Sequence, residues 1–219
     1  MVVAGEARAK HVVRKERGPD PEPVEVGRRS GDETWALLLR VSAQTFARQG
    51  YSGTSLQGIA DELGMLKGSL YYYIHSKEDL LYEIIRDVLQ RALLAAEPSI
   101  AGPGSGLDRL GALVETHVRH LVAHLPETTV YLNDVARLSA ERRALLPEKE
   151  YVALFDQVIA QGREDGSIDT SLDATLTRRS VVGLVNSVST WFGAAGDVSA
   201  EVVAAHVARV VQGGVRAAG

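Results

Sequence analysis

Apolar and small residues recur at helical spacing along most of the chain after residue 31. In the first such segment they fall at positions i, i+3, i+4, i+7 and i+11, which places one stripe along a helix of about four turns. The stripe consists of Trp35, Leu38, Leu39, Ser42 and Phe46. Gly50 follows this segment, and glycine is typical of a helix end because it adopts a left-handed backbone conformation without strain.

Two short helices are predicted next. Residues 54–57 read T-x-x-Q, a capping box whose side chains satisfy the first free amides of a helix. The helix that it opens ends at Gly64, and only Met65 and Leu66 precede a second short segment, Lys67–Tyr73. Two short helices joined by a tight turn are the signature of a helix-turn-helix. The sequence therefore predicts this motif.

A long helix is predicted after the motif. Ser76, with Asp79 three positions later, is a second capping start, and the helix that it opens runs to about Ala96. The following stretch, Pro98–Gly106, is rich in Gly and Pro. We expect it to form a loop within the second domain.

The rest of the chain also shows helical periodicity. The periodic segments are Leu107–Leu125, Thr128–Ala160, Leu172–Phe192 and Ala200–Val215. The second of these is expected to be two helices, divided near Ser139 or Pro147. No segment alternates with a period of two for long enough to suggest a sheet, so the predicted fold class is all-α, with about nine helices.

The first 31 residues differ in composition from the rest. Gly18–Gly31 holds three of the seven prolines and almost no apolar side chains, so it lacks the apolar surface needed to pack. We expect a disordered tail at 1–31, a helix-turn-helix domain at 32–78 and a larger ligand-binding and dimerisation domain at 79–219. The tail holds seven Lys or Arg against five Asp or Glu, which fits either a flexible positive arm for DNA or a solvated segment.

Composition excludes several classes of protein. The chain has no cysteine, which excludes disulfides, thiolate zinc sites and cysteine nucleophiles. Charges interrupt every apolar stretch before the roughly 20 residues that a membrane-spanning helix needs, and no apolar run of a secretory signal follows the N-terminus. We therefore expect a cytoplasmic protein without membrane contact. The net charge of −4, with six basic against eight acidic groups over residues 32–91, does not by itself favour a nucleic-acid partner.

The stretch around residues 54–81, TSLQGIADELGMLKGSLYYYIHSKEDLL, carries a longer ordered pattern. Its parts are Gly50-Tyr51, Thr54-Ser55, Ile59-Ala60, Gly64, Gly68, Leu70-Tyr71 and Ser76-Lys77-Glu78 followed by Leu80. This set resembles the N-terminal domain of the tetracycline repressor (TetR) family over residues 33–82. The resemblance implies a transcriptional regulator that binds a palindromic double-stranded DNA operator as a homodimer, with no enzymatic activity and no cofactor.

The resemblance also assigns roles to eight residues. It implies phosphate contacts at Ser55, Tyr71, Tyr72 and Lys77, and base contacts from Gln57, Lys67, Gly68 and Ser69. Gly68 and Ser69 leave little bulk between the recognition helix and the major groove, and tyrosine hydroxyls can donate to phosphate oxygens. Plain core packing is the alternative for Tyr71–Tyr73. Leu66 stands where the family commonly has a small polar residue, so we expect packing, instead of a helix cap, to hold that turn.

The second domain resembles, more modestly, regulators of fatty-acid, aromatic-acid and sterol breakdown, several of which answer coenzyme A thioesters. The likeness lies in YLNDVARLSAERR, residues 131–143, and WFGAAGDVS, residues 191–199. The cavity candidates are Tyr131 and Trp191 as apolar wall, and Asn186 and Arg137 as partners for a carbonyl or carboxylate. Each has an ordinary alternative, and that of Arg137 is a surface ion pair.

These resemblances predict a repressor that a small-molecule effector, an acyl coenzyme A or another hydrophobic compound, releases from DNA. Two alternatives stay open. One is a repressor of a multidrug efflux pump that senses hydrophobic drugs. The other is a helical interaction module without DNA binding.

Three histidines, His117, His120 and His124, fall on one helical face. Imidazoles at this spacing can bind a metal, but no carboxylate stands at a clear second position, so we expect no metal site and place His117 or His124 at a ligand cavity instead. The runs GPGSG and QGG lack the lysine of a phosphate loop, and GPGSG is not the G-x-S-x-G of a nucleophile elbow. Nothing in the sequence requires catalysis.

The last two predicted helices, Leu172–Phe192 and Val202–Val215, are too apolar for a single exposed stripe. In the resembling family the last two helices pack against their twofold mates, and burial in such an interface accounts for the excess. The alternative is that both helices are buried within one monomer. A dimer also suits a DNA reader that needs two half-sites.

Overall fold

The structure, a computed structural model, describes residues 31–193 and 198–217. Over these residues it has ten α-helices, one short 3-10 helix named η1, and no β-strand, which confirms the all-α prediction. The elements are α1 (Gly31–Gln49), α2 (Leu56–Glu62), α3 (Lys67–Tyr73), α4 (Lys77–Ala101), α5 (Gly106–Ala123), α6 (Leu125–Asp134), η1 (Val135–Arg137), α7 (Ala140–Ala144), α8 (Glu148–Glu164), α9 (Ala174–Trp191) and α10 (Ala200–Val215). The predicted tail lies outside the described residues except for Gly31, which begins α1. No described helix is long and apolar enough to cross a membrane.

The start of α2 differs from the prediction by one residue. Its cap is Ser55, whose hydroxyl accepts a hydrogen bond from the Gly58 amide at 3.0 Å. The hydroxyl of Thr54 instead donates to the carbonyl oxygen of Gly50 at 2.9 Å. The capping box assigned to residues 54–57 is therefore wrong, because Thr54 turns back onto the end of α1.

The end of α4 also differs from the prediction. The helix continues through Pro98, which reduces the expected loop to residues 102–105. A proline inside a helix removes one backbone hydrogen bond. Contacts with the rest of the molecule hold this end in place, since Ala96 is fully buried and the Ser99 hydroxyl lies 2.8 Å from that of Thr116 on α5.

The stretch 128–160 divides at both expected positions instead of one. Ser139 caps α7 by accepting a hydrogen bond from the Arg142 amide, and Pro147 directly precedes α8. Each of these residues marks the start of a new helix. The serine hydroxyl accepts a hydrogen bond from a free backbone amide of the first turn, and the proline has no amide proton with which to continue a preceding helix. The two helices that we expected are therefore three, with η1 between the first and the second.

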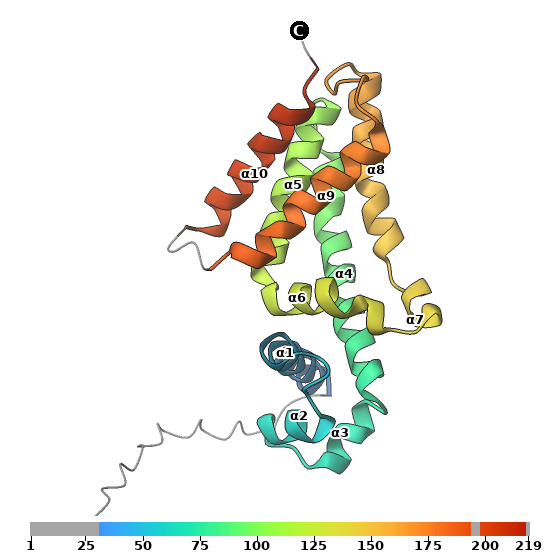
Figure 1. The fold of residues 1–219 in the computed structure, drawn as a ribbon, viewed down its shortest axis with the longest axis vertical. Helices are drawn as coiled ribbons and strands as arrows, with labels where there is room; N and C mark the ends of the chain where they lie inside the picture. The colour runs from blue at the N-terminus through green and yellow to red at the C-terminus, as the bar shows by residue number, and fades with distance from the viewer. Residues whose placement is uncertain (1–30, 194–197, 218–219) are drawn as a thin grey trace, which may run out of the picture.

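Two hydrophobic cores lie one after the other along α4 (Figure 1). The first core joins α1, α2 and α3 to the first half of α4, together with Val130, Leu138 and Leu146 from the region of α6–α8. The second core packs α5, α8, α9 and α10 around the second half of α4. Because α4 belongs to both, the domain boundary predicted between residues 78 and 79 falls in its first turn and stays a prediction.

Candidate DNA interface and ligand cavity

The turn between α2 and α3 is closed by backbone hydrogen bonds. Gly64 adopts a left-handed φ of 64°, and the Met65 amide donates to the Ala60 carbonyl oxygen at 2.9 Å. Leu66 makes no side-chain cap for α3, as the sequence indicated, but its side chain is 80% exposed. The packing at this turn therefore comes from Met65 against the first core and not from Leu66.

The recognition helix α3 packs along one edge and is open along the other. Leu70 is fully buried, and the ring of Tyr73 stacks on Trp35 with a centroid distance of 6.4 Å. Tyr72, in contrast, is 83% exposed, and a Cβ added at Gly68 would meet no atom within 4 Å. Of the three tyrosines, Tyr73 has the packing role and Tyr72 is available at the surface.

Seven of the eight predicted DNA-binding residues are exposed on α2 and α3 or directly before α2. They are Ser55, Gln57, Lys67, Gly68, Ser69, Tyr71 and Tyr72. The side-chain amide of Gln57 donates to Asp61 at 2.7 Å, and the Lys67 ammonium lies 5.8 Å from the centre of the Tyr71 ring. The fold thus brings these residues together at one end of the molecule (Figure 1).

The eighth residue, Lys77, has partners inside the protein. Its ammonium donates hydrogen bonds of 2.9 Å to the carbonyl oxygens of Tyr51 and Thr54, and lies 4.4 Å from the centre of the Tyr51 ring. Lys77 therefore ties the first turn of α4 to the loop between α1 and α2. An ammonium has three protons, so a phosphate contact through the third stays a prediction.

Tyr51 also links this end of the molecule to α6 and η1. Its ring packs edge-on against Phe46 at a centroid distance of 5.2 Å, and the Arg137 guanidinium lies 5.7 Å from its centre. Asp134 forms an ion pair with Arg137 at 2.6 Å. Because Asp134 holds it at this junction, Arg137 lies away from the cavity described below. The structure therefore shows an ion pair for Arg137 and not the predicted place in the cavity.

A second link joins α7 to the start of α4. Arg142 forms an ion pair with Asp79 and lies 3.8 Å from Glu78. The backbone amide of Ser139 donates to the same Glu78 carboxylate at 2.9 Å. The segment from α6 to α7 therefore contacts the DNA-binding end through both the loop after α1 and the first turn of α4.

A cavity of about 50 Å³ lies where the two cores meet. Its lining residues come from α4, α5, α6, α8 and α9: Val88, Leu89, Ala92, His117, His120, Leu121, Thr128, Tyr131, Tyr151, Val152, Val182 and Asn186. Two of the four predicted ligand-binding residues, Tyr131 and Asn186, are among them. Trp191 is not, because it lies more than one turn beyond Asn186 on an open face of α9, with 37% of its surface exposed.

A buried chain of hydrogen bonds forms the polar side of the cavity. The Tyr151 hydroxyl lies 2.8 Å from His117 Nδ1, and His117 Nε2 lies 3.1 Å from Asn186 Oδ1. Burial lowers the pKa of His117 to about 4 and raises that of Tyr151. All three groups are therefore neutral near pH 7.

The structure also shows which histidines reach the cavity. His117 lies there, as expected, but His124 does not, and His120 lies there with its Nε2 3.1 Å from the Val88 carbonyl oxygen. Sequence reasoning missed Tyr151, since nothing local to α8 marks it as polar cavity wall. Among the described residues no group of three or more His, Cys, Asp or Glu could hold a metal ion.

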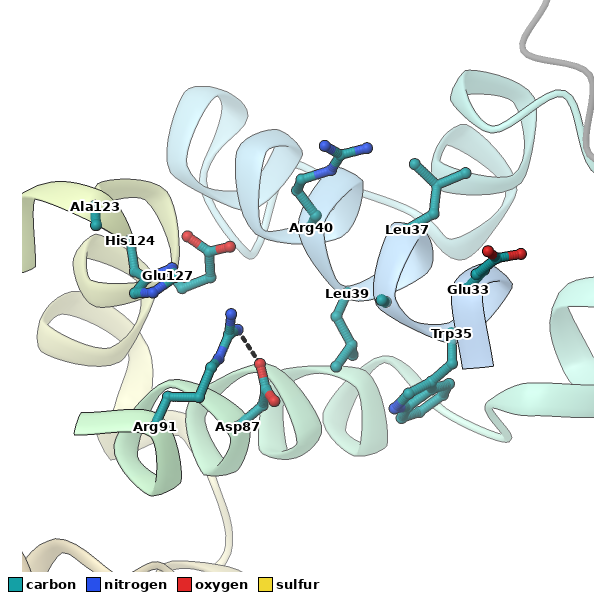
Figure 2. A pocket seen from close by; sticks show the side chains of 11 residues that line it. Glu33, Trp35, Leu37, Leu39, Arg40, Asp87, Arg91, Ala123, His124 and Glu127 are labelled. Carbon is teal, nitrogen blue, oxygen red and sulfur yellow. Dashed lines mark hydrogen bonds and ion pairs between the residues drawn. The ribbon is translucent and has the colours of Figure 1, made fainter. Parts of the chain in front are cut away.

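A larger and more open hollow of about 730 Å³ lies between α1, α4 and the junction of α5 with α6 (Figure 2). Figure 2 shows Arg91 paired with Asp87 on α4, with Glu127 and His124 on the facing junction. On α1, its lining includes Trp35. No sequence pattern predicted this hollow, because its lining comes from segments far apart in the chain.

The last two helices carry exposed apolar side chains. On α9 these are Leu176, Leu184 and Trp191, and on α10 they are Val202 and Val210, each between 37% and 62% exposed. Residues seven or eight positions apart lie on the same side of a helix. Each helix therefore presents an apolar face that the described chain does not cover.

A helix-turn-helix with an open recognition helix, joined to a helical domain with an internal cavity, is the architecture of a ligand-responsive DNA-binding protein. Residues 38–84 match the family model for bacterial regulatory proteins of the tetR family, and residues 103–215 match that for the tetracyclin repressor-like C-terminal domain. The chain belongs to the TetR family. It is a DNA-binding transcriptional repressor and not an enzyme.

Three similar proteins are informative. The HTH-type transcriptional repressor KstR2 of Rhodococcus jostii is 32% identical over 183 residues, which are 81% of this chain and 88% of the relative. The solved structure of the ketosteroid regulator KstR2 of Mycobacterium tuberculosis aligns with a TM-score of 0.78 at 26% identity, over 88% of this chain and 98% of the other. That of AibR in complex with isovaleryl coenzyme A and operator DNA aligns with a TM-score of 0.72 at 25% identity, over 83% and 97%.

Proposed function

We propose that the protein is a homodimeric repressor that inserts α3 into the major groove of a palindromic operator and is released by a hydrophobic acyl effector. The open edge of α3 carries this proposal. Gly68 leaves its backbone accessible, and the exposed Tyr71 and Tyr72 beside it present hydroxyls to phosphates. The base contacts fall to Gln57, Lys67, Gly68 and Ser69, and the phosphate contacts to Ser55, Tyr71, Tyr72 and Lys77.

A second copy of the chain covers the apolar faces of α9 and α10 in this proposal. Leu176 and Val202 are 62% and 60% exposed, and burying such side chains against a twofold mate removes apolar surface from water. Two recognition helices held at a fixed distance then bind two half-sites together.

The effector is proposed to bind at the cavity lined by Tyr131 and Asn186. The similarity to AibR, whose solved structure contains isovaleryl coenzyme A, and to the ketosteroid regulator KstR2 supports a coenzyme A thioester. At about 50 Å³ the cavity is far smaller than the roughly 300 Å³ or more of a typical ligand site. Binding must therefore move the lining helices apart. Because α4 is one of them and also joins α3, this movement changes the separation of the recognition helices.

The experiment tests proposed DNA contacts at residues whose side chains do not hold the folded protein together. Operator duplexes are selected in vitro with the full-length protein, and affinities are measured for Tyr72→Phe, Lys67→Gln and the control Lys149→Gln, an exposed residue of α8. Tyr72→Phe should weaken binding about 5- to 10-fold on every operator variant, and Lys67→Gln should change the preference at one base pair. Lys77 is left out because its ammonium also holds the loop before α2. Wild-type affinity and preference in both variants would contradict the assignment.

A further inference from the structure

The cavity is lined without a single Lys, Arg, Asp or Glu side chain. Its polar groups are neutral ones: two histidines, two tyrosine hydroxyls, one threonine and one amide. Burial lowers the pKa of both His117 and His120 to about 4, so neither imidazole carries charge near neutral pH. A carboxylate placed here would have no cationic partner among the lining side chains.

Among the described residues, the charged groups near Tyr131 and His120 include no unpaired Lys or Arg. Burial, and after it the Glu148 carboxylate, raises the pKa of Tyr131, so the charged group that acts on this hydroxyl is negative. On the side of His120 the nearby charged groups are Arg91 and Asp87, which form an ion pair with each other, and the imidazole of His124 lies beside them. A carboxylate in the cavity would therefore find no free cationic partner beside these two residues.

The side-chain amide of Asn186 offers the cavity an unused hydrogen-bond donor. The carbonyl oxygen of Asn186 accepts from His117 Nε2, which requires the proton on that nitrogen, and His117 Nδ1 then accepts from the Tyr151 hydroxyl. This chain fixes the orientation of the Asn186 amide. Its NH₂ group makes no hydrogen bond to any described residue.

We propose that the Asn186 NH₂ group, oriented by His117 and Tyr151, donates to the carbonyl oxygen of a neutral ester, thioester or ketone, and that the cavity rejects the corresponding free carboxylate. This inference rests on the proposed binding of an acyl effector at the cavity. Its physical basis is that an ionised carboxylate without a cationic partner loses its hydration and regains too little. A neutral carbonyl loses far less and gains one hydrogen bond.

The test uses two probes with the same chain, octanoate and the neutral thioester octanoyl-N-acetylcysteamine, titrated calorimetrically into the full-length protein. At pH 7.5 the thioester should bind at least about 30-fold more tightly than octanoate. At pH 5 the ratio should fall, because part of the octanoate is then protonated and neutral. His117 and His120 stay neutral at this pH, so the site itself does not change. Equal affinities at pH 7.5 would overturn the inference while leaving the proposed effector site intact.

Two variants test whether Asn186 is responsible for the preference for the thioester over octanoate. Asn186→Leu should lower thioester affinity about 10-fold and leave octanoate affinity unchanged, so that the ratio shrinks. Tyr151→Phe should shrink it less, since it only frees the orientation of the amide. The control is Asn133→Leu, an exposed residue of α6. A purely structural role of Asn186 would lower both affinities together. If no chain length from butanoyl to palmitoyl binds in either form, the proposed acyl effector itself is wrong.

Discussion

Gly68 lies on the exposed edge of α3, where an added side chain has free space in the protein, and we propose that this edge faces the major groove. A Cβ there meets no atom within 4 Å, and alanine favours a helix over glycine. Gly68→Ala should therefore leave the free energy of unfolding unchanged or raise it by up to about 1 kcal/mol. Operator affinity should fall at least about 10-fold, because the added methyl group prevents the close approach of α3 to the major groove. Urea denaturation measures the first effect and a DNA shift assay the second. An unchanged operator affinity would contradict the proposed insertion of α3 into the major groove.

His117 makes stability depend on pH. Its pKa is lowered to about 4 in the folded protein, whereas the unfolded chain has the ordinary value of 6.5. As the pH falls from 6.5 toward 4, the unfolded state takes up a proton that the folded state refuses, so stability is lost in this window. Between pH 7 and pH 4.5 the wild type should lose about 2–3 kcal/mol more than His117→Gln, which cannot titrate. Urea midpoints across this range measure the difference, and parallel profiles would contradict it.

At the scale of elements, α7 contacts the start of α4 through Arg142. Arg142→Ala removes the ion pairs with Asp79 and Glu78 but touches neither the cavity nor α3. We expect operator and octanoyl thioester each to bind nearly as in the wild type. The coupling free energy between thioester binding and operator binding, which is typically about 1–3 kcal/mol, should decrease.

The coupling is measured by titrating the thioester with and without operator. Arg143→Ala is the matched control, since this neighbouring side chain is exposed and forms no ion pair with the described residues. An unchanged coupling factor in Arg142→Ala would mean that the coupling between effector and operator does not depend on Arg142 and is carried by α4 or Tyr51 alone. A loss of operator affinity without any effector would instead make Arg142 a support of the DNA-binding fold.

At the scale of the whole molecule, we propose that the exposed faces of α9 and α10 form the interface of a dimer. Leu184→Glu with Val210→Glu places two charges on these faces, where the parent side chains are 40% and 48% exposed. We expect a folded monomer in light scattering and an operator affinity at least about 100-fold weaker, because a single half-site contact remains. The control is Leu145→Glu, which changes a 70% exposed leucine outside both helices and should stay dimeric. A dimeric double variant would place the interface elsewhere.

The sequence alone determined the features that depend on neighbours within one turn. The end of α1 at Gly50 and the start of α4 at Ser76 follow from local capping, and the helix-turn-helix follows from two short periodic segments around Gly64. These signals arise from hydrogen bonds that span three or four positions. The order of the helices around this motif could therefore be predicted from local signals, and the resemblance to the TetR family indicated which end binds DNA.

Tertiary structure decided what lies beside the cavity. Tyr151 and Asn186 stand 34 and 69 positions from His117, and no pattern within one helix brings them together. Arg137 is held by Asp134 and Tyr51 instead of reaching a ligand, and Trp191 lies on the open face of α9. Helical spacing tells which face of a helix is apolar. The packing of α4, α5, α8 and α9 against one another decides which residues of those faces meet, because it is the sum of many contacts between segments far apart in the chain.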